Sequence, residues 1–107
     1  MTDDTRYEDI IASIAGVAVF KVEGVASLSS EAGMSGKLLK RTPKSVQVFL
    51  INEGVVTIEV YINAYYGYSV PDLAYDIQQC VCKEVESATN YKVKAVNVNV
   101  AGVVFQS

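Results

Sequence analysis

Glu59 and Tyr61 are the two residues of this sequence that could most readily do chemistry together. They lie two positions apart in an alternating run that predicts a strand, so their side chains share one face. A carboxylate beside a phenol can act as a general acid or base in a cleft, or can help to bind a small ligand. A solvated carboxylate is the commoner state of such a residue. An enzyme or ligand-binding protein that uses this pair is therefore the alternative to a non-enzymatic protein.

Other catalytic chemistry has few candidates in the chain. The sequence contains no histidine, the side chain that most often moves protons near neutral pH. Cys80 and Cys82 lie two positions apart in a predicted helix, where their side chains diverge and a disulfide would be strained. Two thiolates without histidine do not complete a four-ligand zinc site. We therefore expect reduced cysteines, no catalytic residues, no metal and no cofactor.

A basic segment follows the first predicted strand. It places four of the nine basic residues within a few positions of each other, namely Lys37, Lys40, Arg41 and Lys44. Such a cluster is usually a solvated loop, and the sharper alternative is attraction to lipid headgroups or to an acidic protein. Nucleic-acid binding is the weakest hypothesis, because the chain has a net charge of −3 and phosphate neutralisation needs a basic excess.

Tyrosines gather on the predicted strand that holds Glu59. The odd-numbered residues of this strand share a half-polar face, which suits a sheet with one side open to solvent. Ordinary sheet packing explains such residues, but tyrosine is also enriched where proteins contact each other. The candidate interaction surface comprises Glu59, Tyr61, Asn63, Tyr65, Lys37, Lys40, Arg41 and Lys44.

Two helices are predicted, over residues 7–20 and 70–89. Both show apolar residues at helical spacing, and the second begins with a capping pattern at Ser69. The stripes expected to face the core are Ile10, Ile14 and Val17 in the first helix, and Leu73, Ile77, Val81 and Val85 in the second.

Four strands are predicted around these helices. The second and third are joined by a short glycine-containing turn, and the last should bend between Ala95 and Val96 and again at Gly102. Ser29–Lys44 is expected to be a long loop. The strands are expected at residues 25–28, 46–50, 55–66 and 92–105.

These elements predict one α+β domain spanning residues 1–107, in the order α-β-β-β-α-β. A mixed four-stranded sheet with both helices on one face would bury the apolar stripes. The length of 107 residues suits one domain, and 50% of them are hydrophobic. No secretory signal opens the chain and no apolar run reaches membrane-spanning length. We therefore expect a cytoplasmic protein.

Three motifs follow one another along the chain: the first joins the first helix to the first strand, the second ends the central strand, and the third is the closing strand. The motifs are Ile14-Ala15 ahead of Val22-Glu23-Gly24-Val25, then Val60 to Tyr66-Gly67 followed by Val70-Pro71, and finally Val96-Asn97-Val98-Asn99-Val100-Ala101-Gly102-Val103. In this order and spacing they resemble the alkaline shock protein family of bacterial envelope-stress proteins. The resemblance extends over about residues 10–105.

The resemblance implies a non-enzymatic cytoplasmic protein of bacteria with a role in envelope or alkaline stress. It also implies a position near the membrane, held there by a membrane-anchored partner. The family offers no catalytic residue to carry over to this sequence. We expect a scaffold or protein-interaction domain that docks on a protein partner or associates with itself.

Overall fold

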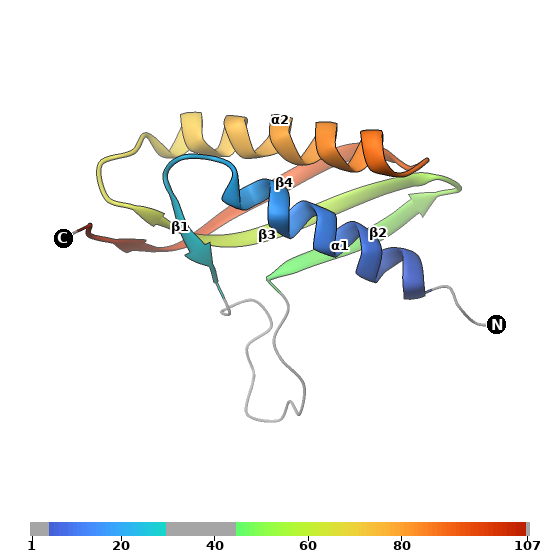
Figure 1. Cartoon of the computed structure of the whole chain (residues 1–107), viewed down its shortest axis with the longest axis horizontal. Helices are drawn as coiled ribbons and strands as arrows, with labels where there is room; N and C mark the ends of the chain where they lie inside the picture. Colours follow the sequence, from blue (N-terminus) through green and yellow to red (C-terminus); the bar gives the residue numbers. More distant parts are fainter. Residues whose placement is uncertain (1–4, 30–44, 107) are drawn as a thin grey trace, which may run out of the picture.

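The computed structural model describes residues 5–29 and 45–106. Within these residues the chain forms two helices and four strands, in the predicted order α-β-β-β-α-β (Figure 1). Each element begins and ends within two residues of its predicted position. The elements are α1 (Thr5–Phe20), β1 (Val25–Leu28), β2 (Val46–Asn52), β3 (Val55–Tyr65), α2 (Val70–Ala88) and β4 (Lys92–Val104).

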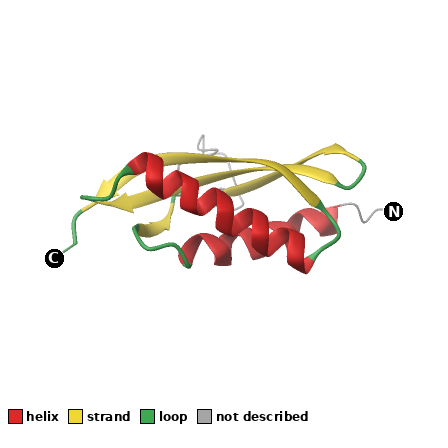
Figure 2. Cartoon of the chain, turned by 90° about the horizontal axis from the view of Figure 1, so that it is seen from above, coloured by secondary structure: helices red, strands yellow, loops and turns green. Residues whose placement is uncertain are grey.

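The four strands form one mixed sheet, and both helices lie on the same face of it, as predicted. β3 is the central strand: it pairs antiparallel with β1 and β2, and parallel with β4 along its whole length. Figure 2 shows both helices on one side of the strands. α2 connects β3 to β4 and packs on β4, whereas α1 packs on β1, β2 and α2. No element that the structure describes covers the opposite face.

β1 and β2 lie end to end along the same edge of β3. β1 pairs with residues 62–64 of β3 and β2 pairs with residues 55–60, both antiparallel. Tyr61 lies at the junction: its carbonyl accepts a hydrogen bond from the N–H of Ser29 at 2.8 Å, and its own N–H donates to the carbonyl of Ser45 at 2.9 Å. The Ser45 hydroxyl also donates to the carbonyl of Ser29. The two strands are therefore the halves of one interrupted strand.

The interruption is the segment predicted as a long loop, Ser29–Lys44. Ser29 is buried, with 2% of its surface exposed. Residues 30–44 lie outside the described residues, so the prediction of a loop there stays a prediction. The described residues fix where this segment leaves the sheet and where it returns, and the two points lie against the same residue of β3.

The hydrophobic core fills the space between the sheet and the helices. Alternate residues of β3 point into it, because successive side chains of a strand face opposite sides. The core stripe predicted for α2 is confirmed, with each residue at most 3% exposed. The buried residues of these two elements are Val56, Ile58, Val60, Ile62 and Ala64 in β3 and Leu73, Ile77, Val81 and Val85 in α2.

The predicted core face of α1 is wrong. Ile10 and Val17 are 53% and 62% exposed, and Ile14 is only partly buried. The helix is apolar on nearly all sides, so several stripes satisfy its periodicity and the pattern does not select one. The small alanines let one side approach the neighbouring elements closely. The buried stripe is Ile11, Ala15, Ala18 and Val19.

The start of α2 follows its sequence signal. The Ser69 side chain accepts a hydrogen bond from the N–H of Asp72 at 3.4 Å, which satisfies one of the free donors of the first turn. Pro71 lies at the beginning of the helix, where its missing N–H costs nothing. The helix ends at Thr89, whose hydroxyl donates to the carbonyl of Val85 at 2.8 Å. These contacts set where the chain turns back toward β4.

β4 contains two irregularities against β3, close to the two predicted bends. The register shifts between Val93 and Ala95, slightly before the predicted site, and again between Val100 and Gly102. Each shift leaves one extra residue on β4, the arrangement of a β-bulge. Between the shifts, the asparagines of β4 lie opposite the open-face residues of β3.

Candidate interaction surfaces

The residues predicted on one face of β3 do share the open face of the sheet. The Tyr61 hydroxyl donates a hydrogen bond to Oε1 of Glu59 at 3.0 Å. This bond raises the pKa of Tyr61 above its ordinary value, and burial and the negative charge of Glu59 add to the effect. In the folded protein the phenol is therefore a hydrogen-bond donor over the physiological pH range.

Asn63 is also held in place on this face. Its Nδ2 donates to the hydroxyl of Ser27 in β1 at 3.0 Å. On the other side it lies opposite Gly102, where an added Cβ would come within 2.8 Å of Oδ1 of Asn63. Glycine therefore allows the asparagine side chain to lie across β4. Tyr65 continues the same face and is half-buried.

Glu59 and Tyr61 form a hydrogen-bonded pair on the open face. The acceptor oxygen and the donor hydrogen of the pair therefore already have partners. Four grooves on the described residues are lined by other side chains. The contribution of this face is therefore an aromatic and polar surface that a second macromolecule could cover.

The basic residues of the predicted surface lie elsewhere. They fall in the segment that lies outside the described residues, so their position relative to Tyr61 stays a prediction. The junction at Ser29 and Ser45 shows only that the chain leaves and re-enters beside Tyr61. The residues concerned are Lys37, Lys40, Arg41 and Lys44.

A second aromatic patch lies where β3 and β4 end. The rings of Tyr66 and Phe105 stack with their centroids 4.7 Å apart. Both are strongly exposed, at 65% and 72%, and Val103 beside them is 53% exposed. The cluster of tyrosines is visible in the sequence, but the position of Phe105 beside Tyr66 is not, because it depends on the parallel pairing of β3 and β4.

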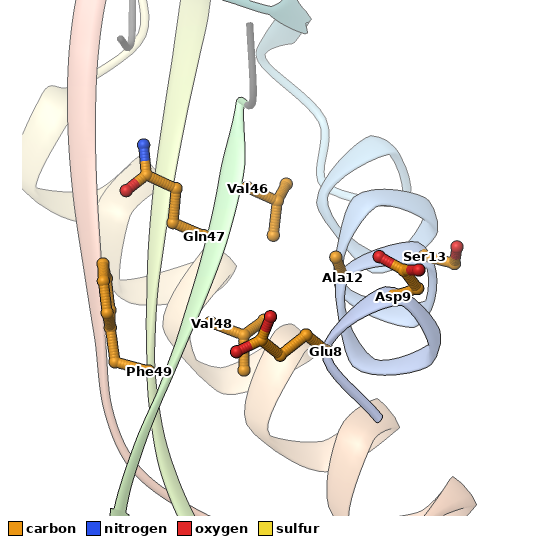
Figure 3. A pocket seen from close by; sticks show the side chains of 8 residues that line it. All are labelled: Glu8, Asp9, Ala12, Ser13, Val46, Gln47, Val48 and Phe49. Atoms are coloured by element: carbon orange, nitrogen blue, oxygen red, sulfur yellow. The ribbon is translucent and has the colours of Figure 1, made fainter. Parts of the chain in front are cut away.

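A groove runs between α1 and the outer edge of β2, with a volume of about 580 Å³. Figure 3 shows Val46 and Val48 pointing from β2 toward the helix, while Gln47 and Phe49 point away from it. The groove was not predicted from the sequence, because it arises from the position of a helix beside a strand edge. The one available signal was the absence of charge in β2. The lining residues are Glu8, Asp9, Ala12, Ser13, Val46, Gln47, Val48 and Phe49.

The two cysteines lie on α2 and are partly buried. Both are free thiols, and the thiol of Cys80 donates to the carbonyl of Ala18 in α1 at 3.4 Å. Burial raises the pKa of the Cys82 thiol, and the nearby carboxylate of Glu86 raises it further. A raised pKa lowers the thiolate fraction and so the reactivity of the sulfur.

Two further features bear on what the described residues could do. Over residues 5–29 and 45–106, no group of three or more acidic, cysteine or histidine side chains is placed to hold a metal ion. Within the same residues, no helix has the length and apolar character needed to cross a membrane.

These surfaces and the two-layer α+β fold define a small domain that presents an uncovered sheet face and exposed aromatic side chains. The chain belongs to the alkaline shock protein 23 family, a family with a cell envelope-related function, which matches it over residues 4–105. The resemblance seen in the sequence motifs is thereby confirmed.

Two bacterial relatives are similar to this chain. The uncharacterized protein Spy1535 of Streptococcus pyogenes serotype M6 is 30% identical over 95 residues, covering 89% of this chain and 74% of the relative. The uncharacterized protein YqhY of Bacillus subtilis strain 168 is 28% identical over 102 residues, covering 92% and 75%. No solved structure matches the chain. The family indicates a cell envelope-related role, while these relatives carry no described activity.

Proposed function

We propose that this protein is a non-enzymatic scaffold or protein-interaction domain that acts in the cytoplasm close to the membrane, where a protein partner holds it. The open sheet face around Tyr61 and Tyr65 is the docking surface in this proposal. The observation that carries it is that no described element covers this face, although it bears aromatic side chains. The cell envelope-related function of the family supports the location.

The side-chain order of the open face also supports docking. Tyr61 and Asn63 are each held by a hydrogen bond to a neighbouring side chain. Side chains that are already fixed lose little conformational entropy when a partner covers them, so more of the contact energy appears as affinity. A pre-ordered aromatic surface is thus suited to binding another protein.

Co-sedimentation with membrane vesicles tests the proposal. The purified chain is mixed with vesicles from native cells, with the same vesicles after trypsin treatment, and with protein-free vesicles of the extracted lipids. We expect sedimentation with the first preparation alone. The double substitution Tyr61→Ala/Tyr65→Ala should weaken it by roughly tenfold or more, as expected when aromatic anchors are lost from an interface.

Tyr75→Ala is the matched control, since Tyr75 is 59% exposed on α2, away from the open face. It should sediment like the parent chain. Failure to sediment with native vesicles, or equal sedimentation of the double variant, would contradict the proposal. Equal binding to protein-free lipid vesicles would show that the chain binds lipid directly and needs no protein partner. Light scattering of the purified chain separates partner docking from self-association through the same face.

The alternative, an enzyme or ligand-binding protein using Glu59 and Tyr61, gains no specific support. Their mutual hydrogen bond and the location of the grooves favour a surface role. That the protein is not an enzyme remains part of the proposal.

A further inference from the structure

We propose that the groove between α1 and the free edge of β2 binds an extended segment of a partner protein, with basic residues at alternate positions and apolar residues between them. The segment adds to the sheet as a further strand. This inference rests on the proposed role as a protein-interaction domain and assigns that role a second surface, distinct from the open face.

The groove follows the backbone edge of β2. Its lining includes four consecutive residues, Val46 to Phe49. Because neighbouring side chains of a strand point to opposite faces, a cavity that touches all four must lie along the edge, not over one face. Figure 3 shows the same arrangement, with side chains leaving β2 alternately toward α1 and away from it.

Backbone groups of β2 point into this groove without a partner strand. The N–H of Tyr61 bonds to the carbonyl of Ser45, which fixes the alternation of inward and outward residues in this antiparallel pair. By that alternation, the N–H and C=O of Val46 and Val48 point outward. No strand among the described residues pairs there. An extended peptide could form main-chain hydrogen bonds at this edge.

At the opposite edge of the sheet, side chains already bond to the backbone of β4. On β4, the side chain of Gln78 donates to the carbonyl of Val96 at 3.1 Å, and the carboxylate of Glu86 accepts from the N–H of Val93 at 2.8 Å. β4 also carries two lysines, which discourage edge-to-edge pairing. β2, with the sequence VQVFLIN, has neither charge nor proline. Of these two edges, β2 therefore has the weaker protection.

The charges of the groove select a basic occupant. Glu8 and Asp9 lie on its α1 side, and the Tyr7 hydroxyl donates a hydrogen bond to Oε2 of Glu8 at 3.4 Å. Figure 3 shows Glu8 reaching from α1 toward Val48. A lysine on the α1 side of an added strand could lay its methylenes on Ala12 and place its ammonium at these carboxylates. The next residue would face Phe49, which is 46% exposed, and would therefore be apolar.

A second copy of this chain fits the groove less well. Its β2 edge would bring another Glu8 and Asp9 to the same interface, and the whole chain has a net charge of −3. Like charges brought together at an interface weaken association. A basic segment of another protein neutralises the groove, whereas a second copy doubles its charge.

A peptide titration followed by NMR tests the proposal on the 107-residue chain. The probe is a capped octapeptide of alternating lysine and valine. We expect amide shifts concentrated at residues 46–49 and in the first turns of α1. Glu8→Gln/Asp9→Asn should weaken binding by about fivefold, since exposed ion pairs are individually modest. The matched control is Asp72→Asn/Asp76→Asn, which removes the same charge from the exposed side of α2 and should bind like the parent.

Further peptides test strand addition itself. An octapeptide with the same composition in lysine and valine pairs lacks the alternation and should bind more weakly. Two N-methylated peptides are compared, one methylated at every lysine and the other at every valine. Only one of them should lose binding, because only alternate backbone N–H groups of an added strand face β2. Which set abolishes binding also gives the direction of the strand.

Several outcomes would overturn the inference. These are equal binding of the paired-sequence peptide, binding that survives both N-methylations, shifts spread over the whole surface, and a homodimer through β2 that excludes the peptide. The variant Tyr61→Ala/Tyr65→Ala should bind the peptide like the parent. Its peptide binding therefore separates a failure of the groove from a failure of the open face.

Discussion

Tyr61 has two separate roles in the molecule. Its backbone joins the two halves of the interrupted edge strand through Ser29 and Ser45, and its phenol bonds to Glu59 on the open face. The backbone role is independent of the side chain. Substitution of Tyr61 by alanine should therefore alter the surface and leave the strand junction intact, which makes it a suitable probe of docking.

The raised pKa of Tyr61 predicts a change in stability at alkaline pH. A group whose pKa is raised by folding stabilises the fold below its unfolded pKa, and this contribution is lost as the pH rises through its folded pKa. For tyrosine that window lies above about pH 10. Glu59→Gln removes the main cause of the shift. It should lower the Tyr61 pKa and make the fall of the urea midpoint above that pH shallower.

NMR of chain labelled at the tyrosine ring carbons measures the pKa of each phenol. Glu23→Gln is the control, because Glu23 bonds to Tyr68 and raises the pKa of that residue instead. It should leave the titration of Tyr61 unchanged. A Tyr61 pKa that does not respond to Glu59→Gln would contradict the assigned hydrogen bond.

The sequence predicted part of the candidate site at this scale. Alternation placed Glu59, Tyr61, Asn63 and Tyr65 on one face, because strand geometry fixes parity within a single element. It could not predict the partner of Asn63, which comes from β1, or the stacking of Tyr66 on a residue of another segment. Contacts between elements depend on register, and register depends on the whole sheet.

At the scale of elements, two neighbouring residues of α1 differ strongly in solvent exposure. Ile11 is 1% exposed and Ile10 is 53% exposed. Ile11→Ala should lower the free energy of unfolding by about 2–5 kcal/mol through lost burial and a residual cavity. Ile10→Ala should change it by less than about 1 kcal/mol. Urea unfolding followed by circular dichroism measures both, and equal losses would contradict the orientation of the helix.

The same contrast shows why one helix was read correctly and the other was not. α2 alternates apolar stripes with charged residues, so a single stripe can face the core. α1 has isoleucine, valine or alanine on nearly every side, so periodicity does not choose between Ile10 and Ile11. Small residues that allow close packing on neighbouring elements decide which face of α1 is buried. The pattern within one helix does not contain this information.

At the scale of the whole molecule, the element order, the turn between β2 and β3, the mixed sheet and the layer arrangement were predicted, because each followed from local signals and the short connections between them. The joining of β1 and β2 into one interrupted strand was not predicted. The predicted loop Ser29–Lys44 separates the two strands in the sequence, so local patterns did not indicate that both pair with the same edge of β3.

This topology predicts that residues 30–44 can be removed without loss of the fold. Their deletion joins Ser29 to Ser45, both of which bond to Tyr61, and leaves two residues opposite one, as in a β-bulge. We expect a free energy of unfolding within about 2 kcal/mol of the parent. Urea unfolding and the dispersion of the amide NMR spectrum measure it.

Ser29→Pro in the full chain is the control for the junction. It removes the N–H that bonds to the carbonyl of Tyr61 and should destabilise the fold by about 1–3 kcal/mol. A deletion variant that loses its dispersed spectrum would contradict the interrupted-strand topology.

Because of the junction at Tyr61, the free energy of folding should depend only weakly on the length of the segment between Ser29 and Ser45. Since both ends of the interruption are pinned to one residue of β3, a longer segment there adds only loop-closure entropy. Doubling such a segment costs about 0.6 kcal/mol, against a typical folding free energy of about 5–15 kcal/mol. The domain thus contains a position where sequence can be inserted, exchanged or lengthened while the sheet and its two helices keep their shape.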